Sequence, residues 1–135
     1  MRTTLLTSFL FITLMIGCKK GSDNVTNTSN SPLVGFWELT QHKMIYAKDS
    51  TTSYVTAELG SVIKFNSDNT YTWTFTSGSQ SGSWSIDGKK LTLTRTGKSP
   101  FVYDEYNVEG AKLILIFIDP FHDSYYTHTE EYIKK

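Results

Sequence analysis

The sequence is poor in cysteine and has no excess charge of either sign. Only one of its 135 residues is cysteine, so no disulfide can form within the chain. Thirteen basic residues are balanced by thirteen acidic ones, which leaves no net field to attract a polyanion. We therefore expect no nucleic acid among its partners. A chain of this length allows one domain with one core, and we expect a monomer.

Long apolar runs are also missing. The longest one, Leu5–Ile16, is shorter than the roughly 20 residues that a transmembrane helix needs. It follows Arg2 and precedes Gly17. A basic start, a short apolar stretch and a small residue before the cleavage point are typical of a secretory signal. We predict that residues 1–17 are a signal peptide.

The end of this run accounts for the lone cysteine. Residues 14–17, which read LMIG, stand directly before Cys18 and resemble the lipobox of bacterial lipoproteins. The resemblance implies cleavage before Cys18 and acyl chains such as palmitate on it, so that the membrane is a partner. Lys19 stands where an aspartate would retain a Gram-negative lipoprotein in the inner membrane. The resemblance thus implies the cell envelope at the outer membrane. Surface-exported lipoproteins of some lineages carry an acidic run after the cysteine, and its absence here favours the periplasmic face.

Residues 18–32 contain a single aliphatic side chain among many Ser, Thr and Asn residues. Such a segment cannot bury enough surface to order itself, so we predict a disordered tether. Residues 33–135 then form the folded domain.

The stretch Ser61–Thr94 predicts an antiparallel meander with one solvent-exposed face. Its large apolar residues alternate with serines, threonines and lysines, and period 2 with β-branched and aromatic residues is typical of half-buried strands. The apolar face carries Phe65, Tyr71, Trp73, Phe75, Trp84, Ile86, Leu91 and Leu93.

Three turns are expected to set the register of this meander. A three-residue turn at Ser67–Asn69, with Asn69 left-handed, places Phe65 opposite Tyr71. A two-residue turn at Gly78-Ser79 places Trp73 opposite Trp84. A type I′ turn at Asp87-Gly88 places Trp84 opposite Leu91.

Further strands are expected on both sides of the meander, and no segment after residue 17 has a helical period. Lys112–Ile118 is apolar on both faces and predicts a strand covered on both sides. The other expected elements are a first strand at Gly35–Tyr46, an irregular piece at Ala47–Gly60 with a short strand or a loop, a strand at Phe101–Val108, a loop at Asp119–Asp123, and a last strand at Ser124–Ile133. The fold class is all-β.

Closing such a meander into an up-and-down barrel of about eight strands removes its edges. Gly35 and Trp37 resemble the lipocalin signature, and the segments 64–71 and 82–88 resemble the small lipocalin-like domain of bacterial lipoproteins. The resemblance implies a Trp37 that closes the barrel floor. In lipocalins an arginine of the last strand covers this tryptophan, whereas here the last strand offers only His128 and lysines. A β-sandwich is the alternative fold.

The sequence offers no catalytic constellation. It contains no Gly-x-Ser-x-Gly motif. Adjacent carboxylates such as Glu130-Glu131 point to opposite faces of a strand. The three histidines, His42, His122 and His128, lie at irregular spacing, which predicts exposed side chains rather than a metal site. Tyr103 and Glu105 share one face of a predicted strand and are a candidate polar spot.

An enzyme is the least supported of three function classes, because the sequence shows no converging titratable groups, and we expect neither catalysis nor a cofactor. The other two functions are non-enzymatic. In one, the eight apolar residues of the meander line a cavity that binds a small apolar or amphipathic ligand. In the other, they fill the core, and the domain is a structural or protein-interaction module of the envelope. An eight-stranded barrel is just wide enough for either arrangement.

Overall fold

The computed structural model describes residues 30–121 and 124–135, which fold into one antiparallel sheet of ten strands. The predicted signal peptide, Cys18 and most of the tether lie outside the described residues, as does His122. No helix within the described part is long and apolar enough to span a membrane. The strands are β1 (Gly35–Tyr46), β2 (Thr52–Tyr54), β3 (Val62–Phe65), β4 (Thr70–Phe75), β5 (Gly78–Asp87), β6 (Lys90–Arg95), β7 (Phe101–Tyr103), β8 (Glu105–Glu109), β9 (Lys112–Phe121) and β10 (Ser124–Lys134).

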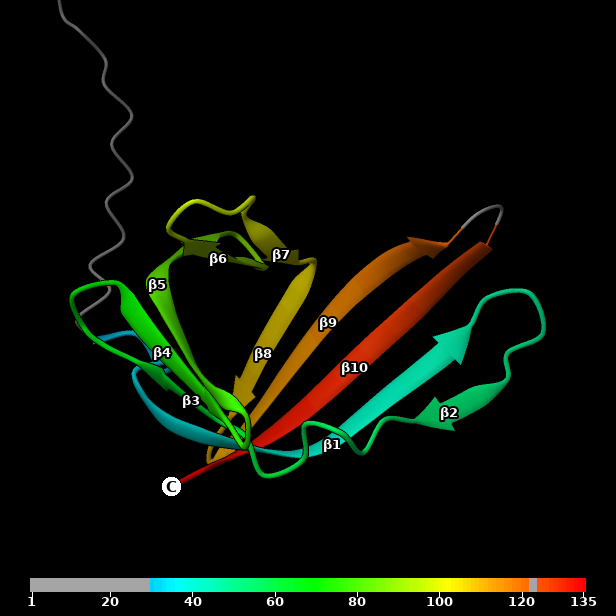
Figure 1. The fold of residues 1–135 in the computed structure, drawn as a ribbon, viewed down its shortest axis with the longest axis horizontal. Helices are drawn as coiled ribbons and strands as arrows, with labels where there is room; N and C mark the ends of the chain where they lie inside the picture. Colours follow the sequence, from blue (N-terminus) through cyan, green and yellow to red (C-terminus); the bar gives the residue numbers. More distant parts are fainter. Residues whose placement is uncertain (1–29, 122–123) are drawn as a thin grey trace, which may run out of the picture.

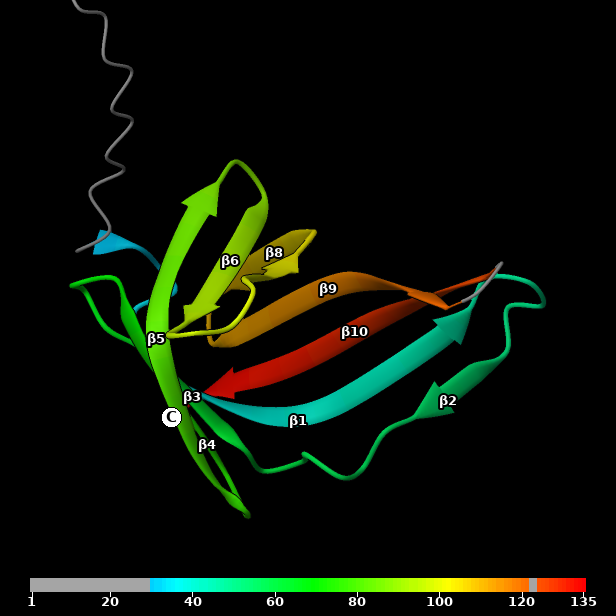
Figure 2. The same cartoon turned by 45° about the horizontal axis from the view of Figure 1, so that its top comes forward.

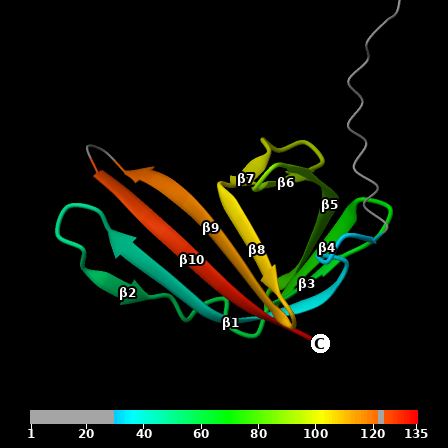
Figure 3. The same ribbon diagram turned by 180° about the vertical axis from the view of Figure 1, so that it is seen from behind.

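The strand order is β7-β6-β5-β4-β3-β1-β10-β9-β8, with β2 paired to the outer half of β1. The first and last long strands are therefore neighbours, and β7 and β8 are the two edges. The sheet curls so that β3–β5 face β8–β10, with β6 and β7 between them (Figure 1). From behind, the same curl is visible with β8 in front of β9 (Figure 3).

A bend at Asp104 brings the two edges of the sheet together. The segment predicted as one strand, Phe101–Val108, is two: β7 pairs with β6, whereas β8 pairs with β9. The amide of Tyr106 donates to the carbonyl of Lys89 at 2.9 Å, and Lys89 Nζ lies 3.1 Å from a carboxylate oxygen of Glu105. When β7 and β8 count as one bent strand and β2 is set aside, the barrel has eight strands. The predicted all-β, antiparallel, nearly closed barrel is confirmed, and a sandwich is not formed.

Two of the three predicted turns are wrong, although the predicted face is kept. Phe65 lies opposite Tyr71, and Asn69 has a φ of 67°, as expected. Trp73, however, lies opposite Gln80 and not opposite Trp84, so the turn before β5 is two residues earlier than predicted. Trp84 lies opposite Leu93 and not opposite Leu91, so the next turn is one residue later.

Both shifts move the pairing partner by an even number of residues, so every side chain keeps its face. The observed register places Gly82 opposite Tyr71, whose ring lies close to it, and Gly78 opposite Phe75. A Cβ on Gly82 would lie 2.1 Å from the Thr94 carbonyl oxygen, so only glycine fits there.

The core lies at the end of the barrel where β1 and β9 begin and β10 ends. The fully buried large side chains are Leu33, Trp37, Leu39, Ile63, Phe65, Leu91, Tyr103, Leu113, Leu115 and Tyr132. Trp37 Nε1 donates to the Leu33 carbonyl at 2.7 Å. Lys134 Nζ lies 5.2 Å from the centre of the Trp37 ring, so a lysine of the last strand lies over this tryptophan.

At the other end, β1, β9 and β10 continue as a long ribbon beyond the rest of the sheet (Figure 2). The expected loop at residues 119–123 is shorter than predicted, because β9 extends to Phe121. The outer face of β9 is not covered as expected: Ile118 is 51% exposed and Ile114 and Ile116 are half-buried. The first strand and the short strand within Ala47–Gly60 agree with the sequence prediction.

Candidate functional site

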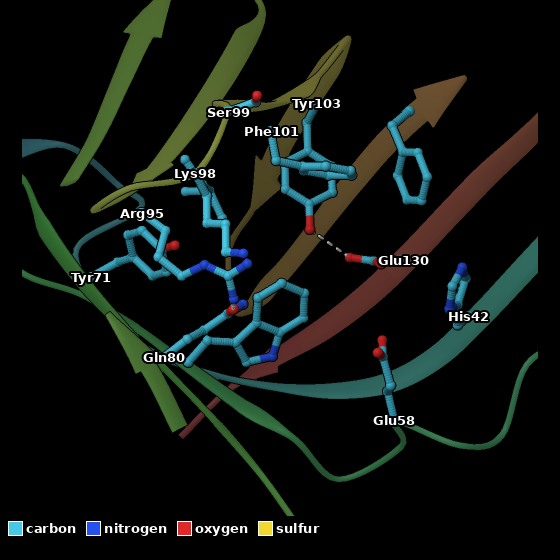
Figure 4. A pocket seen from close by; sticks show the side chains of 13 residues that line it. His42, Glu58, Tyr71, Gln80, Arg95, Lys98, Ser99, Phe101, Tyr103 and Glu130 are labelled. Carbon is cyan, nitrogen blue, oxygen red and sulfur yellow. Dashed lines mark hydrogen bonds between the residues drawn. The ribbon is translucent and has the colours of Figure 1, made fainter. Parts of the chain in front are cut away.

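The barrel encloses a cavity of about 350 Å³ that opens at one side. Its walls come from β1, β4–β7, β9 and β10 and from the segments that contain Glu58 and Lys98 (Figure 4). The lining residues are His42, Glu58, Tyr71, Trp73, Gln80, Leu93, Arg95, Lys98, Ser99, Phe101, Tyr103, Phe117 and Glu130.

One part of the wall is aromatic. The Phe101 ring meets the rings of Tyr103 and Phe117 edge-on, each at 5.0 Å between centroids. Leu93 is the pairing partner of Phe101 on the neighbouring strand β6, and Trp73 adds apolar surface from β4. These contacts hold the rings in place from β7 and β9, so the apolar surface of the cavity is preformed.

Next to this aromatic part, the wall contains a buried carboxyl group. Glu130 is 2% exposed, and its Oε2 accepts hydrogen bonds from Tyr103 at 3.0 Å and Tyr132 at 2.8 Å. Burial raises the pKa of Glu130 from 4.5 to about 7, because the loss of water outweighs the two hydroxyl donors, which favour the charged form. Burial also raises the pKa of Tyr103 and Tyr132, so both phenols are neutral donors.

Two histidines lie beside this carboxyl group. His42 Nε2 and His128 Nδ1 are 3.0 Å apart, and the His128 ring stacks on Phe117 at 4.2 Å. Burial lowers the pKa of both imidazoles, and the neighbouring His128 lowers that of His42 further. Both rings are therefore neutral at pH 7 and above. His42 Nδ1 is buried and has no hydrogen-bond partner among the described residues.

Cations lie at another part of the rim. Arg95 ends β6, and Lys98 follows it in an exposed turn. The Arg95 guanidinium donates to the side-chain oxygen of Gln80 on the neighbouring strand β5 (Figure 4). The cavity therefore has an apolar wall, a neutral or acidic polar wall, and a positively charged rim.

The structure divides the eight candidate lining residues of the meander into three groups. Tyr71, Trp73 and Leu93 line the cavity. Phe65, Trp84 and Leu91 are buried in the core, and Phe75 and Ile86 are half-buried against it. Gly35 and Trp37 lie at the closed end, away from the cavity. The barrel is thus filled at one end and hollow at the other.

The polar residues of the cavity differ from those that the sequence suggested. Tyr103 does contribute a polar group, but its partner is Glu130; Glu105 is turned outward to Lys89 because the chain bends at Asp104. His42 and His128 were expected to be exposed and are buried. The alternation of β10, in which Glu130 shares the parity of the buried Tyr132, was the one available signal for Glu130.

A nearly closed antiparallel barrel with an open cavity is the architecture of proteins that hold one small molecule inside a barrel. The comparison with known families agrees: the model of the lipocalin-like domain family matches residues 33–115. The chain belongs to this family, whose members are generally binding proteins. 

One solved structure is similar, a crystal structure of a DUF4847 family protein from Bacteroides vulgatus ATCC 8482. It has 16% sequence identity and a TM-score of 0.47, over 77% of this chain and 93% of the other. No curated protein matches the chain.

Proposed function

We propose that this chain is a lipid-anchored protein of the Gram-negative cell envelope that binds a small amphipathic molecule in its barrel. The cavity of about 350 Å³ carries the proposal. Its volume lies at the lower end of the range for small-molecule sites, roughly 300–1,000 Å³. Such a volume admits one small ligand.

The lining favours an amphipathic ligand over a purely apolar one. Trp73, Leu93 and Phe101 offer an apolar surface to a chain or ring. Glu130 and the Tyr103 hydroxyl offer hydrogen bonds beside this surface, and an unpaired polar group there would cost about 1–3 kcal/mol. A ligand with one apolar part and one hydrogen-bonding part satisfies both walls.

Acylation of Cys18 would place this cavity close to a lipid surface. The mature chain would be held by several acyl chains, which bind far more firmly than one, at about 0.8 kcal/mol per buried methylene. Lys19 in place of aspartate favours the outer membrane, and the absence of an acidic run after Cys18 favours its periplasmic face.

A second function, a protein-interaction module, is favoured by the outer face of β9 and β10. Ile118, Tyr125 and Ile133 are each at least half exposed there. They are separate from the cavity, so the two functions do not exclude each other.

Native mass spectrometry of the mature protein, purified gently from the bacterium that makes it, tests ligand binding. We expect a retained small molecule that is released on denaturation. The test variant is Trp73→Ala, which should lose the molecule. The matched control is Ile118→Ala on the outer face, which should keep it. A protein that carries no molecule and binds no apolar dye would contradict the proposed ligand binding and favour the protein-interaction module.

A further inference from the structure

Three potential metal ligands converge on one side of the cavity. His42 comes from β1, Glu130 from β10, and Glu58 from the turn before β3. One ligand atom of each lies within 4.8 Å of those of the other two. Figure 4 shows their side chains directed toward one another at the end of the cavity away from Arg95.

The hydrogen bonds around these residues leave possible metal-ligand atoms free for a further partner. His42 is 7% exposed; its Nε2 meets His128, whereas its buried Nδ1 meets no described group. Both tyrosine hydroxyls donate to Oε2 of Glu130, which leaves Oε1 without a hydrogen bond from the described residues. An unpartnered buried polar atom costs about 1–3 kcal/mol, so an imidazole nitrogen left in this way suggests a missing partner.

We propose that His42, Glu58 and Glu130 bind one divalent cation of the first transition row, for which Zn²⁺ is the best match. One imidazole nitrogen and two carboxylate oxygens are a donor set that Zn²⁺ accepts, whereas Ca²⁺ and Mg²⁺ prefer oxygen alone. Three protein ligands leave a fourth position for water or a ligand atom from the cavity.

Binding of Zn²⁺ requires only a local movement of the three ligand atoms. Ligand atoms about 2.0–2.1 Å from a tetrahedral Zn²⁺ lie about 3.3 Å apart. The separations of up to 4.8 Å must therefore shorten by about 1.5 Å. Glu58 can supply this movement, because it is exposed in a turn, whereas His42 and Glu130 are fixed on paired strands.

The surrounding contacts resemble those that orient metal ligands. Metal-bound histidines almost always donate their other ring N–H to a neighbour, and bound carboxylates accept hydrogen bonds. Here His128 Nδ1 can accept from His42 Nε2, which fixes the tautomer with a free lone pair on Nδ1. Tyr103 and Tyr132 hold Glu130. In the other tautomer, His42 Nδ1 carries a proton and donates to a carboxylate through water, and no metal binds.

The sequence argued against a metal site because the three histidines are irregularly spaced. That argument does not apply to this site, whose ligands come from three segments that are distant in sequence and whose only histidine is His42. The proposed cation does not depend on the amphipathic ligand, although both would share the cavity.

Calorimetric titration of Zn²⁺ alone into the full chain tests the site. The protein is purified in detergent, stripped of bound lipid, and treated with EDTA. We expect one Zn²⁺ per chain, and affinity reduced at least about tenfold in Glu58→Gln and His42→Gln. Glu58→Gln is the decisive variant, because an exposed turn residue should not affect folding. Glu109→Gln, an exposed glutamate outside the cavity, is the matched control and should bind like wild type.

A second measurement identifies the ligand atom. Long-range proton–nitrogen NMR spectra should show a shift of His42 Nδ1 on addition of Zn²⁺. No binding, equal binding by wild type and Glu58→Gln, or a shift at a different histidine instead of His42 would overturn the inference. Apolar dye binding by the same stripped protein is measured in parallel. Absence of Zn²⁺ binding with intact dye binding refutes only the proposed cation. Zn²⁺ binding without dye binding refutes only the amphipathic ligand.

Discussion

Trp73 and Trp84 share one face of the meander but lie in different surroundings, so their truncation should have different consequences. Trp84 is 2% exposed, its Nε1 donates to the Asn66 carbonyl at 3.1 Å, and its ring meets Phe65 edge-on at 5.6 Å. Trp73 is 9% exposed and lines the cavity, so part of its ring already borders open space.

Truncation of a packed tryptophan costs about 3–5 kcal/mol. Trp84→Ala also leaves the Asn66 carbonyl without its hydrogen-bond donor, which adds about 1 kcal/mol to this cost. The total stability of a domain is about 5–15 kcal/mol. Trp84→Ala should therefore remove a large part of this stability. Trp73→Ala gives up packing contacts on one side of the ring and the hydrogen bond from Nε1 to Ser61 Oγ at 3.2 Å, and we expect a loss of about 1–3 kcal/mol.

Thermal unfolding followed by circular dichroism, together with the affinity for an environment-sensitive apolar dye, checks this difference. We expect Trp84→Ala to melt far below wild type, and Trp73→Ala to remain folded but bind the dye differently. Thr72→Ala and Ser83→Ala, on the other face, should change neither quantity. Equal losses of stability for both tryptophans, with unchanged dye affinity in Trp73→Ala, would show that the cavity is filled.

Four further expectations can be checked separately. Gly82→Ala should cost about 3 kcal/mol or more in a denaturant titration, because its Cβ would meet the Thr94 carbonyl oxygen; a stability within about 0.5 kcal/mol of wild type would contradict the observed register. Cys18→Ala should abolish acyl labelling, and unchanged labelling would exclude the anchor. A chain that starts at Ser31 should melt like the mature protein, and a clear loss would mean that the tether docks on the domain. In metal-free protein the pKa of Glu130 rises on folding from 4.5 to about 7. The stability that this carboxyl group contributes is therefore complete below pH 4.5, and about 3 kcal/mol of it is lost as the pH rises to 7. Glu130→Gln should flatten the dependence of the unfolding free energy on pH in this range, and an unchanged slope would exclude a buried carboxyl.

The strands and their faces could be predicted from the sequence because alternation depends only on local pattern. Trp73 and Trp84 keep their face in both the expected and the observed register, since each error was an even number of residues. The exact pairing depends on tertiary contacts that turn residues do not reveal. The ring of Tyr71 requires the bare backbone of Gly82 beneath it, and this contact selects the turn at Thr76 and Ser77.

The polar wall of the cavity could not be predicted, because an irregularity in β1 reverses its alternation. Leu39 points into the barrel; the register with β10 then shifts between Leu39 and Gln41, so that His42, which would otherwise point outward, lies inside. One extra residue in one strand has this effect and leaves little trace in the sequence. Glu130 had one signal, the parity that it shares with Tyr132, but a charged residue in a polar strand is usually solvated.

The two ends of the barrel contribute differently to stability and to binding. Phe65, Trp84 and Leu91 fill the closed end with well-packed apolar surface, which supplies the free energy of folding. At the open end, a buried carboxyl with a raised pKa and an unpartnered His42 Nδ1 both reduce stability. Apolar side chains of similar size would fit a purely structural barrel better. Polar groups that cost stability, are held in place by neighbouring hydroxyls and border a cavity are typical of sites kept for binding. The cost of Glu130 and His42 to the fold is therefore itself an argument that the cavity binds something.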